Sequence, residues 1–137
     1  MSAPVSVTAP TPLSWWRRPP ALLAVGAAWL LTRQSPARIQ TILLLARRGA
    51  RPATYAQASR AKENVLATSV QCAGEGCLQR SLATALLCRL RGTWPTWCTG
   101  VRTRPFGAHA WVQADDHPVD EPYPRDYYRP ILVVPPT

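Results

Sequence analysis

The spacing of hydrophobic residues changes about half-way along the chain. In the first half, apolar residues recur every three or four positions, which is typical of helices with one buried face. This pattern predicts helices over residues 21–31, 37–48 and 54–70. Ser35 shortly precedes the second of these segments and Thr54 begins the third, and at such positions a side-chain oxygen caps the free N–H groups of a helix.

The second half begins with one more helical segment and then changes to a period of two. Residues 77–91 carry an apolar stripe along one side, which predicts an amphipathic helix that ends before Gly92. Alternating apolar and polar residues then predict short strands over residues 97–104, 108–114, 118–121 and 131–134. Helices followed by a small antiparallel sheet indicate an α+β fold.

The chain is long enough for one domain with one modest core. Residues 1–20 are rich in Pro, Ser and Thr, so we expect a flexible arm there. Two tryptophans at 15–16 are either an anchor for this arm or a loosely packed pair. One domain is then expected over residues 21–137, made of a helical region, 21–70, and a region with the fourth helix and the sheet, 71–137.

The charge of the chain restricts its partners. Sixteen basic and seven acidic residues give a net charge of +9, which favours an acidic partner. The arginines lack the interleaved aromatic residues of an RNA-binding sheet, so we expect a peptide or protein partner rather than nucleic acid. The apolar stretch at 21–31 is too short to span a bilayer, and no secretory signal is evident. We therefore expect a cytoplasmic protein without an integral membrane segment.

The four cysteines are spaced too widely for a CxxC pair: Cys72, Cys77, Cys88 and Cys98. This spacing disfavours a structural zinc site, and no metal or organic cofactor is expected. In a reducing compartment an unpaired cysteine is either a small buried apolar residue or a nucleophile. Cys88 on the helix and Cys98 in a strand fit the first description. Cys72 fits either description and lies close to Cys77 in the sequence.

Cys77 differs from the other three because it starts a helix after a glycine-containing turn. The N–H groups at a helix start are unpaired and carry partial positive charge, so they stabilise a thiolate and lower its pKa. The same groups are suited to hold the oxyanion that forms when a thiolate attacks an amide. Gln71 is a weaker candidate for that task. Taken alone, a cysteine at a helix start is more often structural than catalytic.

His109 strengthens the case for chemistry at Cys77. It lies in a predicted strand, on the same face as Trp111. A neutral imidazole beside a thiol takes its proton and later protonates a leaving amine. A lone strand histidine is more often a packed residue, but the other histidine, His117, falls in a loop between two predicted strands.

A third group is needed to orient the imidazole, and two acids on the returning strand are candidates. A two-residue hairpin loop puts Asp120 on the His109 face, and a three-residue loop puts Glu121 there. The sequence leaves this choice open. Asp115 and Asp116 have the simpler interpretation of turn residues.

Three segments resemble the lasso-peptide leader peptidases. Residues 76–83, Gly-Cys-Leu-Gln-Arg-Ser-Leu-Ala, resemble the nucleophile motif of that family, C-L-x-R-S-L. Residues 105–112, with the run Ala-His-Ala-Trp-Val, resemble its histidine motif, and residues 128–134 resemble its closing segment. The resemblance covers residues 35–137. Its order of nucleophile helix, histidine strand and acid strand is that of papain-like and transglutaminase-like folds.

The resemblance implies a cysteine peptidase that removes the leader from a ribosomally made lasso-peptide precursor before macrolactam cyclisation. Such enzymes act with a small leader-recognition protein and an ATP-dependent cyclase. It implies that Cys77 is the nucleophile and His109 the general base. The family has an Asp twelve residues after its His, and this chain has Glu121 at that position, with Asp120 beside it.

Other functions are compatible with the same residues. A transglutaminase-like acyl transferase or an amidase uses the same triad with a different acceptor. A scaffold that binds the leader or the cyclase without catalysis is a third possibility. Replacement of Cys77 by alanine distinguishes it, because a scaffold would keep its full effect. The helical N-terminal half, including 15–16 and 21–31, is also a candidate for docking to a membrane surface or a partner.

Overall fold

The structure is a computed structural model that describes residues 16–69, 76–124 and 126–137. Most of the predicted N-terminal arm, including Trp15, lies outside the described residues. The same holds for Gln71 and Cys72.

The predicted helices are present, with bounds close to those expected. They are α1 (Arg18–Leu31), α2 (Pro36–Ala46), α3 (Tyr55–Thr68) and α5 (Cys77–Leu90). Ser35 accepts a hydrogen bond from the backbone of Arg38, and Thr54 forms a reciprocal capping box with Gln57, so both predicted N-caps are confirmed. The helix α1 starts at Arg18, so the flexible arm predicted over residues 1–20 is wrong for its last three residues.

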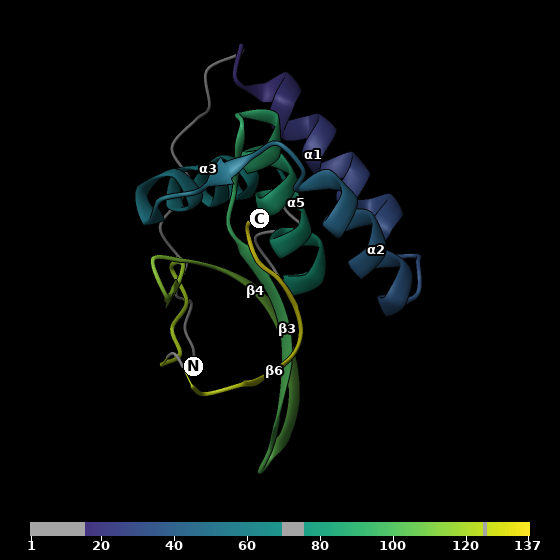
Figure 1. The fold of residues 1–137 in the computed structure, drawn as a ribbon, viewed down its shortest axis with the longest axis vertical. Helices are drawn as coiled ribbons and strands as arrows, with labels where there is room; N and C mark the ends of the chain where they lie inside the picture. Colours follow the sequence, from purple (N-terminus) through teal and green to yellow (C-terminus); the bar gives the residue numbers. More distant parts are fainter. Residues whose placement is uncertain (1–15, 70–75, 125) are drawn as a thin grey trace.

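The sheet is antiparallel and has four strands in the order β5-β4-β3-β6. Its strands are β3 (Thr96–Thr103), β4 (Phe106–Ala114), β5 (His117–Pro118) and β6 (Arg129–Val134). A separate parallel pair joins β1 (Arg51–Pro52) to β2 (Thr93–Trp94). The helices lie together at one end of the long β3–β4 hairpin (Figure 1). The predicted α+β fold is confirmed.

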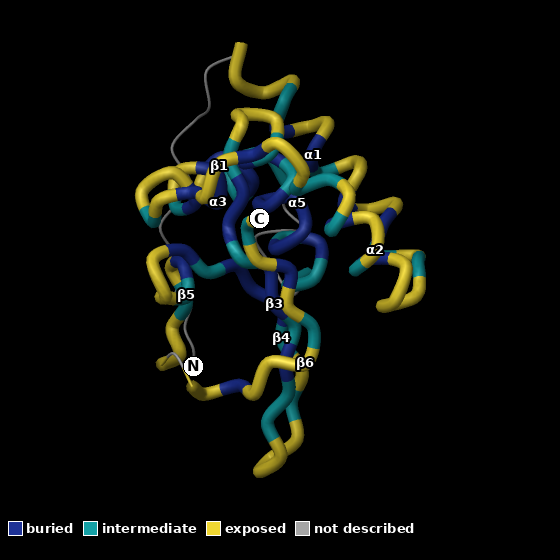
Figure 2. The backbone as a smooth tube through the Cα atoms, viewed as in Figure 1, coloured by how far each residue is buried: buried dark blue, intermediate teal, exposed yellow. Residues whose placement is uncertain are grey.

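The helix α5 is the centre of the molecule, with α1, α3 and the sheet packed around it (Figures 1 and 2). Leu82 and Leu87 are fully buried, and so is Thr84 on another side of the helix. Buried polar groups are satisfied locally, because the hydroxyls of Ser81 and Thr84 donate to carbonyls of the preceding turn. The prediction of an amphipathic helix with one apolar stripe is therefore wrong for α5, which is enclosed along most of its length.

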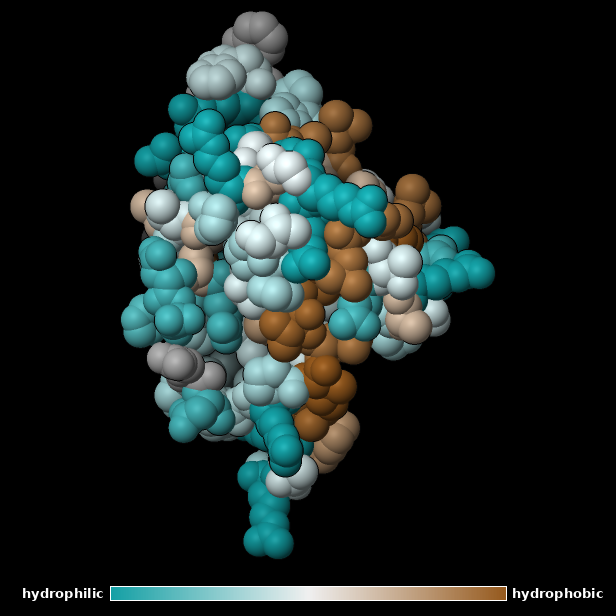
Figure 3. Space-filling view, viewed as in Figure 1, coloured by the Kyte–Doolittle hydropathy of each residue, from teal (hydrophilic) through white to brown (hydrophobic). Residues whose placement is uncertain are grey.

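The outer helices leave apolar side chains exposed. We call this surface the apolar face, and Figure 3 shows its apolar side chains gathered over α1, α2 and β6. Its exposed residues are Leu22, Leu23, Trp29, Leu30, Ile42, Leu45, Ile131 and Val133.

The first 62 residues contain nine basic and no acidic side chains, whereas the remaining 75 contain seven of each. The whole net charge of the chain therefore arises in the part that supplies α1 and α2.

Within the described residues, no helix has the length and apolar character needed to cross a membrane.

Gly100 allows a close approach between β3, β4 and β6. It pairs with His109 of β4, and the register with β6 shifts between Thr99 and Gly100. A Cβ atom there would lie 2.5 Å from the carbonyl oxygen of Arg129 and 2.9 Å from the ring of Trp111. The glycine therefore allows the backbone of β6 and the ring of Trp111 to pack against β3 at the position that pairs with His109.

We expect Gly100→Ala to lower the free energy of unfolding by about 1–3 kcal/mol, because the backbone of β6 and the Trp111 ring must move. Urea unfolding followed by circular dichroism measures this change. Gly26→Ala in the middle of α1 is the matched control, because a Cβ there meets nothing within 4 Å. It should add about 0.5–1 kcal/mol through helix propensity. Equal effects at the two positions would show that the contact at Gly100 is unimportant.

Candidate active site

Cys77 is the first residue of α5, as predicted, and its side chain is only partly buried. Gly76 is the N-cap and provides no side-chain hydrogen bond to the first turn. Within the part of the chain that the structure describes, no capping side chain therefore binds the first N–H groups of α5, and their partial positive charge lies beside the thiol.

His109 of β4 connects the thiol to a carboxylate. Its Nε2 lies 2.6 Å from Oε1 of Glu121, and its side chain forms a hydrogen bond with Cys77. The backbone of Ala110 adds a second hydrogen bond to Cys77. Thiol, imidazole and carboxylate thus form one chain of hydrogen bonds.

The acid that reaches His109 is Glu121, although the turn has only two residues. Asp115 and Asp116 form this turn, with φ of 53° and 63°, a geometry that suits a tight hairpin. By strand alternation such a turn should bring Asp120 to the histidine, so that part of the register argument is wrong. The strand predicted over residues 118–121 stops at Pro118, and Asp120 then adopts φ of 50°. The alternation ends there, which lets the next residue turn toward His109.

Asp120 serves the neighbouring helix instead. Its carboxylate accepts hydrogen bonds from the hydroxyls of Tyr55 (3.2 Å) and Ser59 (2.6 Å), both on α3. Its backbone N–H donates to the same Tyr55 hydroxyl. Asp115 accepts from the backbone N–H of Tyr55 at the start of α3. The segment from Asp115 to Asp120, which leads into Glu121, is therefore fixed to α3 at both of its ends.

Lys62 completes this attachment. Its Nζ lies 2.7 Å from Oε2 of Glu121 and donates to the carbonyls of Val119 and Asp120, both at 2.9 Å. The side chains of Lys62 and Glu121 are only 9% and 6% exposed. One oxygen of Glu121 thus binds the lysine and the other binds the histidine, so the carboxylate is held from both sides.

These contacts shift the ionisation of all three groups. The hydrogen bond with His109 lowers the pKa of Cys77 against the opposing effect of burial. Burial alone would lower the pKa of His109, but hydrogen bonds with Cys77 and Glu121 raise it to about 9. Burial likewise opposes ionisation of Glu121, yet the His109 hydrogen bond and the Lys62 charge hold its pKa below the usual value. Together these shifts favour a thiolate beside an imidazolium at neutral pH.

A comparison with protein families agrees with the transglutaminase-like fold that the sequence predicts. The family model described as "Transglutaminase-like superfamily" matches residues 21–133, which is most of the chain. The chain belongs to the transglutaminase-like superfamily. This superfamily includes cysteine peptidases and acyltransferases. No curated protein and no solved structure matches the chain.

Aromatic rings surround the imidazole in this transglutaminase-like site. The ring of His109 stacks on Trp111 at 5.7 Å and contacts Tyr128 at 5.1 Å and Tyr123 at 5.8 Å between ring centroids. Tyr123 stacks in turn on the partly exposed Tyr127. These rings orient His109 and form an aromatic wall beside the thiol.

The remaining candidates have structural positions in the described part of the chain. Cys88 and Cys98 are each 1% exposed, and burial raises their pKa values to about 11 and about 12. His117 is exposed and lies in β5 rather than in a loop. Ser81 accepts a hydrogen bond from the indole of Trp97 and so contributes to packing. Among the described residues, no group of His, Cys, Asp or Glu side chains could hold a metal ion.

Sequence reasoning missed the role of Lys62. A signal was available, because Lys62 is the single lysine of the chain and lies four residues after Ala58 and three before Val65. That spacing puts it on the buried face of a helix, where a charge needs a partner.

We expect Lys62→Met to lower the free energy of unfolding by about 3 kcal/mol, because it leaves the buried Glu121 carboxylate without its cation. Urea unfolding measures the loss. Glu63→Gln, on the exposed side of the same helix turn, is the control and should change stability by less than about 0.5 kcal/mol. A loss of similar size in both variants would argue against the buried pair.

The thiol of Cys77 should titrate at lower pH than an ordinary cysteine. We expect its alkylation by iodoacetamide to reach half of its maximal rate well below pH 9, and His109→Ala to move this midpoint upward because the hydrogen bond is lost. Stopped-time alkylation with mass spectrometry across pH measures both, in a Cys72→Ser background. Cys77→Ala is the control that removes the fast-reacting thiol. An unchanged midpoint in His109→Ala would contradict the pairing.

Proposed function

We propose that this chain is a cysteine peptidase that removes the leader from a lasso-peptide precursor. The observation that carries the proposal is the hydrogen-bonded series Cys77–His109–Glu121 at the uncapped start of α5. In this proposal Cys77 is the nucleophile, His109 the general base and acid, and Glu121 the group that orients the imidazole.

The first chemical step is attack of the Cys77 thiolate on the carbonyl carbon of the bond that joins leader and core. The electron pair of the carbonyl moves to its oxygen, and the free N–H groups at the start of α5 are suited to stabilise that oxyanion. When the tetrahedral intermediate collapses, the C–N bond breaks and the His109 imidazolium gives its proton to the leaving nitrogen. The core leaves with a free amine, and the leader stays on sulfur as a thioester.

The second step restores the enzyme. Water attacks the thioester, His109 accepts a proton from that water, and the C–S bond breaks to release the leader as a carboxylic acid. Glu121 stabilises the imidazolium in both steps without taking its proton, because its pKa is held low by His109 and Lys62. The free amine on the core is the group that a macrolactam cyclase requires.

The choice of a leader as substrate rests on the sequence motifs around Cys77 and His109, which resemble those of lasso-peptide leader peptidases. The position twelve residues after His109 holds Glu121 where that family has Asp, and its longer side chain still reaches the imidazole at 2.6 Å. The substitution is therefore compatible with the same role. The aromatic wall of Tyr123, Tyr127 and Tyr128 provides an apolar surface beside the reacting sulfur.

The proposed partners follow from the same resemblance. A small leader-recognition protein presents the precursor, and an ATP-dependent cyclase takes the freed core, all in the cytoplasm, where the thiol stays reduced. For the recognition protein we favour docking on the apolar face. Six of the eight exposed residues of that face lie within the first 62 residues, a segment with nine basic and no acidic side chains, which suits a partner with an apolar patch rimmed by carboxylates.

The test is cleavage of the precursor peptide, with and without the leader-recognition protein, read by mass spectrometry. We expect a single cut between leader and core, abolished in Cys77→Ala and reduced by a factor of at least about 10² in His109→Ala. Glu121→Gln should lose more activity than the matched Asp120→Asn, because only Glu121 contacts the imidazole.

Three results would redirect the proposal. Unimpaired cleavage by Cys77→Ala, or no cleavage with the partner present, would replace it with a scaffold role. Addition of a primary amine to the assay distinguishes the acyl transferase. If the released leader then carries the amine rather than a carboxylic acid, water is not the preferred acceptor.

A further inference from the structure

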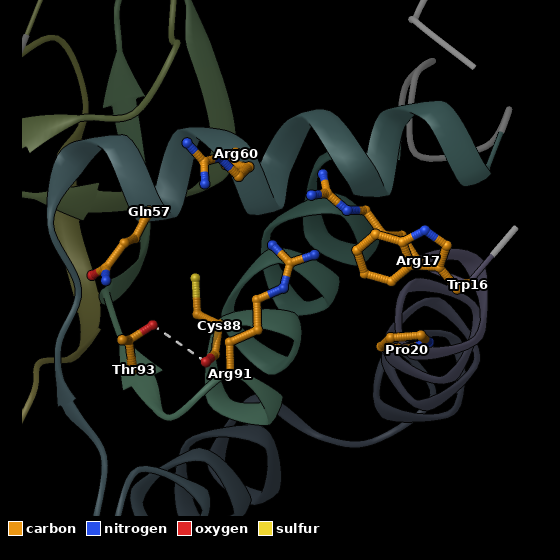
Figure 4. A pocket seen from close by; sticks show the side chains of 8 residues that line it. All are labelled: Trp16, Arg17, Pro20, Gln57, Arg60, Cys88, Arg91 and Thr93. Carbon is orange, nitrogen blue, oxygen red and sulfur yellow. Dashed lines mark hydrogen bonds between the residues drawn. The ribbon is translucent and has the colours of Figure 1, made fainter. Parts of the chain in front are cut away.

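A hollow lies away from the thiol, between the start of α1, the middle of α3 and the end of α5 (Figure 4). It has a volume of about 380 Å³, within the range of about 300–1,000 Å³ that small-molecule sites occupy. Cys88 lies in its wall, eleven residues along α5 from Cys77, which is about 16 Å along the helix axis. The hollow is therefore distinct from the candidate active site.

Three arginines from separate parts of the chain line this hollow. Arg17 precedes α1, Arg60 lies on α3 and Arg91 follows α5, and their guanidinium groups extend toward the same space (Figure 4). Arg17 is held over the ring of Trp16, with 4.7 Å between its guanidinium carbon and the ring centroid. The carboxamide oxygen of Gln57, a further lining residue, accepts a hydrogen bond from the backbone of Thr54, which leaves its NH₂ group as a donor.

No carboxylate neutralises these arginines in the described part of the chain. The ion pairs recorded among residues 16–69, 76–124 and 126–137 both involve Glu121, at the other end of α5. Burial, with repulsion from Arg17 and Arg60, lowers the pKa of Arg91. The cluster thus has an unfavourable self-energy that a bound anion would relieve.

A purely structural role explains one of the three. Arg91 is the C-cap of α5, where a cation interacts favourably with the helix dipole. Arg60 lies in the exposed middle of α3, and Arg17 lies at the N-terminal end of α1, where a positive charge is disfavoured. Their convergence on the hollow therefore calls for a different explanation.

We infer that this hollow binds the phosphoryl group of a small molecule. A phosphate carries about two negative charges at neutral pH and several acceptor oxygens, so it can accept from three guanidiniums at once. A carboxylate has one charge and two oxygens, and one guanidinium fork already satisfies it. A half-open hollow of this volume suits a phosphorylated metabolite better than a nucleic-acid backbone, which is bound along an extended basic surface.

The test is isothermal titration of the full chain, without any peptide, using pyrophosphate and AMP as probes at constant ionic strength. We expect binding in the sub-millimolar range, weakened at least about tenfold by Arg60→Gln and by Arg91→Gln. Because Arg91 is also the C-cap of α5, its replacement changes the helix end as well as the hollow, whereas Arg60 on α3 has no part in that cap. Arg48→Gln, an exposed arginine at the end of α2 that does not line the hollow, is the control and should bind as tightly as the parent.

The inference fails if neither probe binds, or if Arg48→Gln weakens binding as much as Arg60→Gln, since that would indicate diffuse charge. Co-sedimentation of the protein with phosphatidylglycerol vesicles tests whether the ligand is a lipid headgroup rather than a free metabolite. Binding to vesicles but to neither soluble probe would overturn the small-molecule assignment. Because no cleavage is measured, these outcomes are independent of the peptidase proposal.

Discussion

The ammonium group of Lys62 is the contact on which the candidate site depends. It binds two consecutive backbone carbonyls and one oxygen of Glu121, so a single cation fixes both the path of the loop and the direction of the acid. A lysine removed from water is costly unless all its donors are used, and here three acceptors meet three donors. The same contact joins α3 to the sheet, and His109 takes its orientation from the acid held in this way. Packing, electrostatics and catalytic geometry therefore meet in one side chain.

Much of the fold follows from local sequence signals, and the part that does not is the part held by long-range contacts. Ser35 and Thr54 cap their helices as expected, and Cys77 starts a helix after the glycine turn. The period of two identifies β3 and β4, and so the placement of His109. Strand alternation did not identify the third residue, because it assumes a continuous strand, whereas the resemblance pointed to the position of Glu121. Asp120 breaks it with a left-handed conformation that Tyr55 and Ser59 stabilise from some sixty residues away in sequence. No local pattern around Asp120 reveals those partners.

The helix α5 has a different electrostatic task at each end. At its start, N–H groups without a side-chain cap face a thiol that they help to ionise. At its end, Arg91 meets the carbonyl end of the helix and two further arginines. Between these ends the helix is enclosed by apolar neighbours and carries hydroxyls that bind carbonyls of its own preceding turn, so a buried segment separates the two environments. Buried residues on more than one side of α5, among them Leu82 and Thr84, accompany the packing of α1, α3 and the sheet around it.

The uneven distribution of charge gives the molecule a direction in solution. The first 62 residues carry the entire surplus of nine positive charges, and the rest of the chain is balanced. Such a molecule is an electric dipole as well as a cation, so the field of an acidic body rotates it before the two touch. Encounters then begin with the basic part of the molecule turned toward the acidic body. This orientation acts over roughly one Debye length, about 8 Å at physiological ionic strength, so added salt should slow productive encounters without altering the site itself.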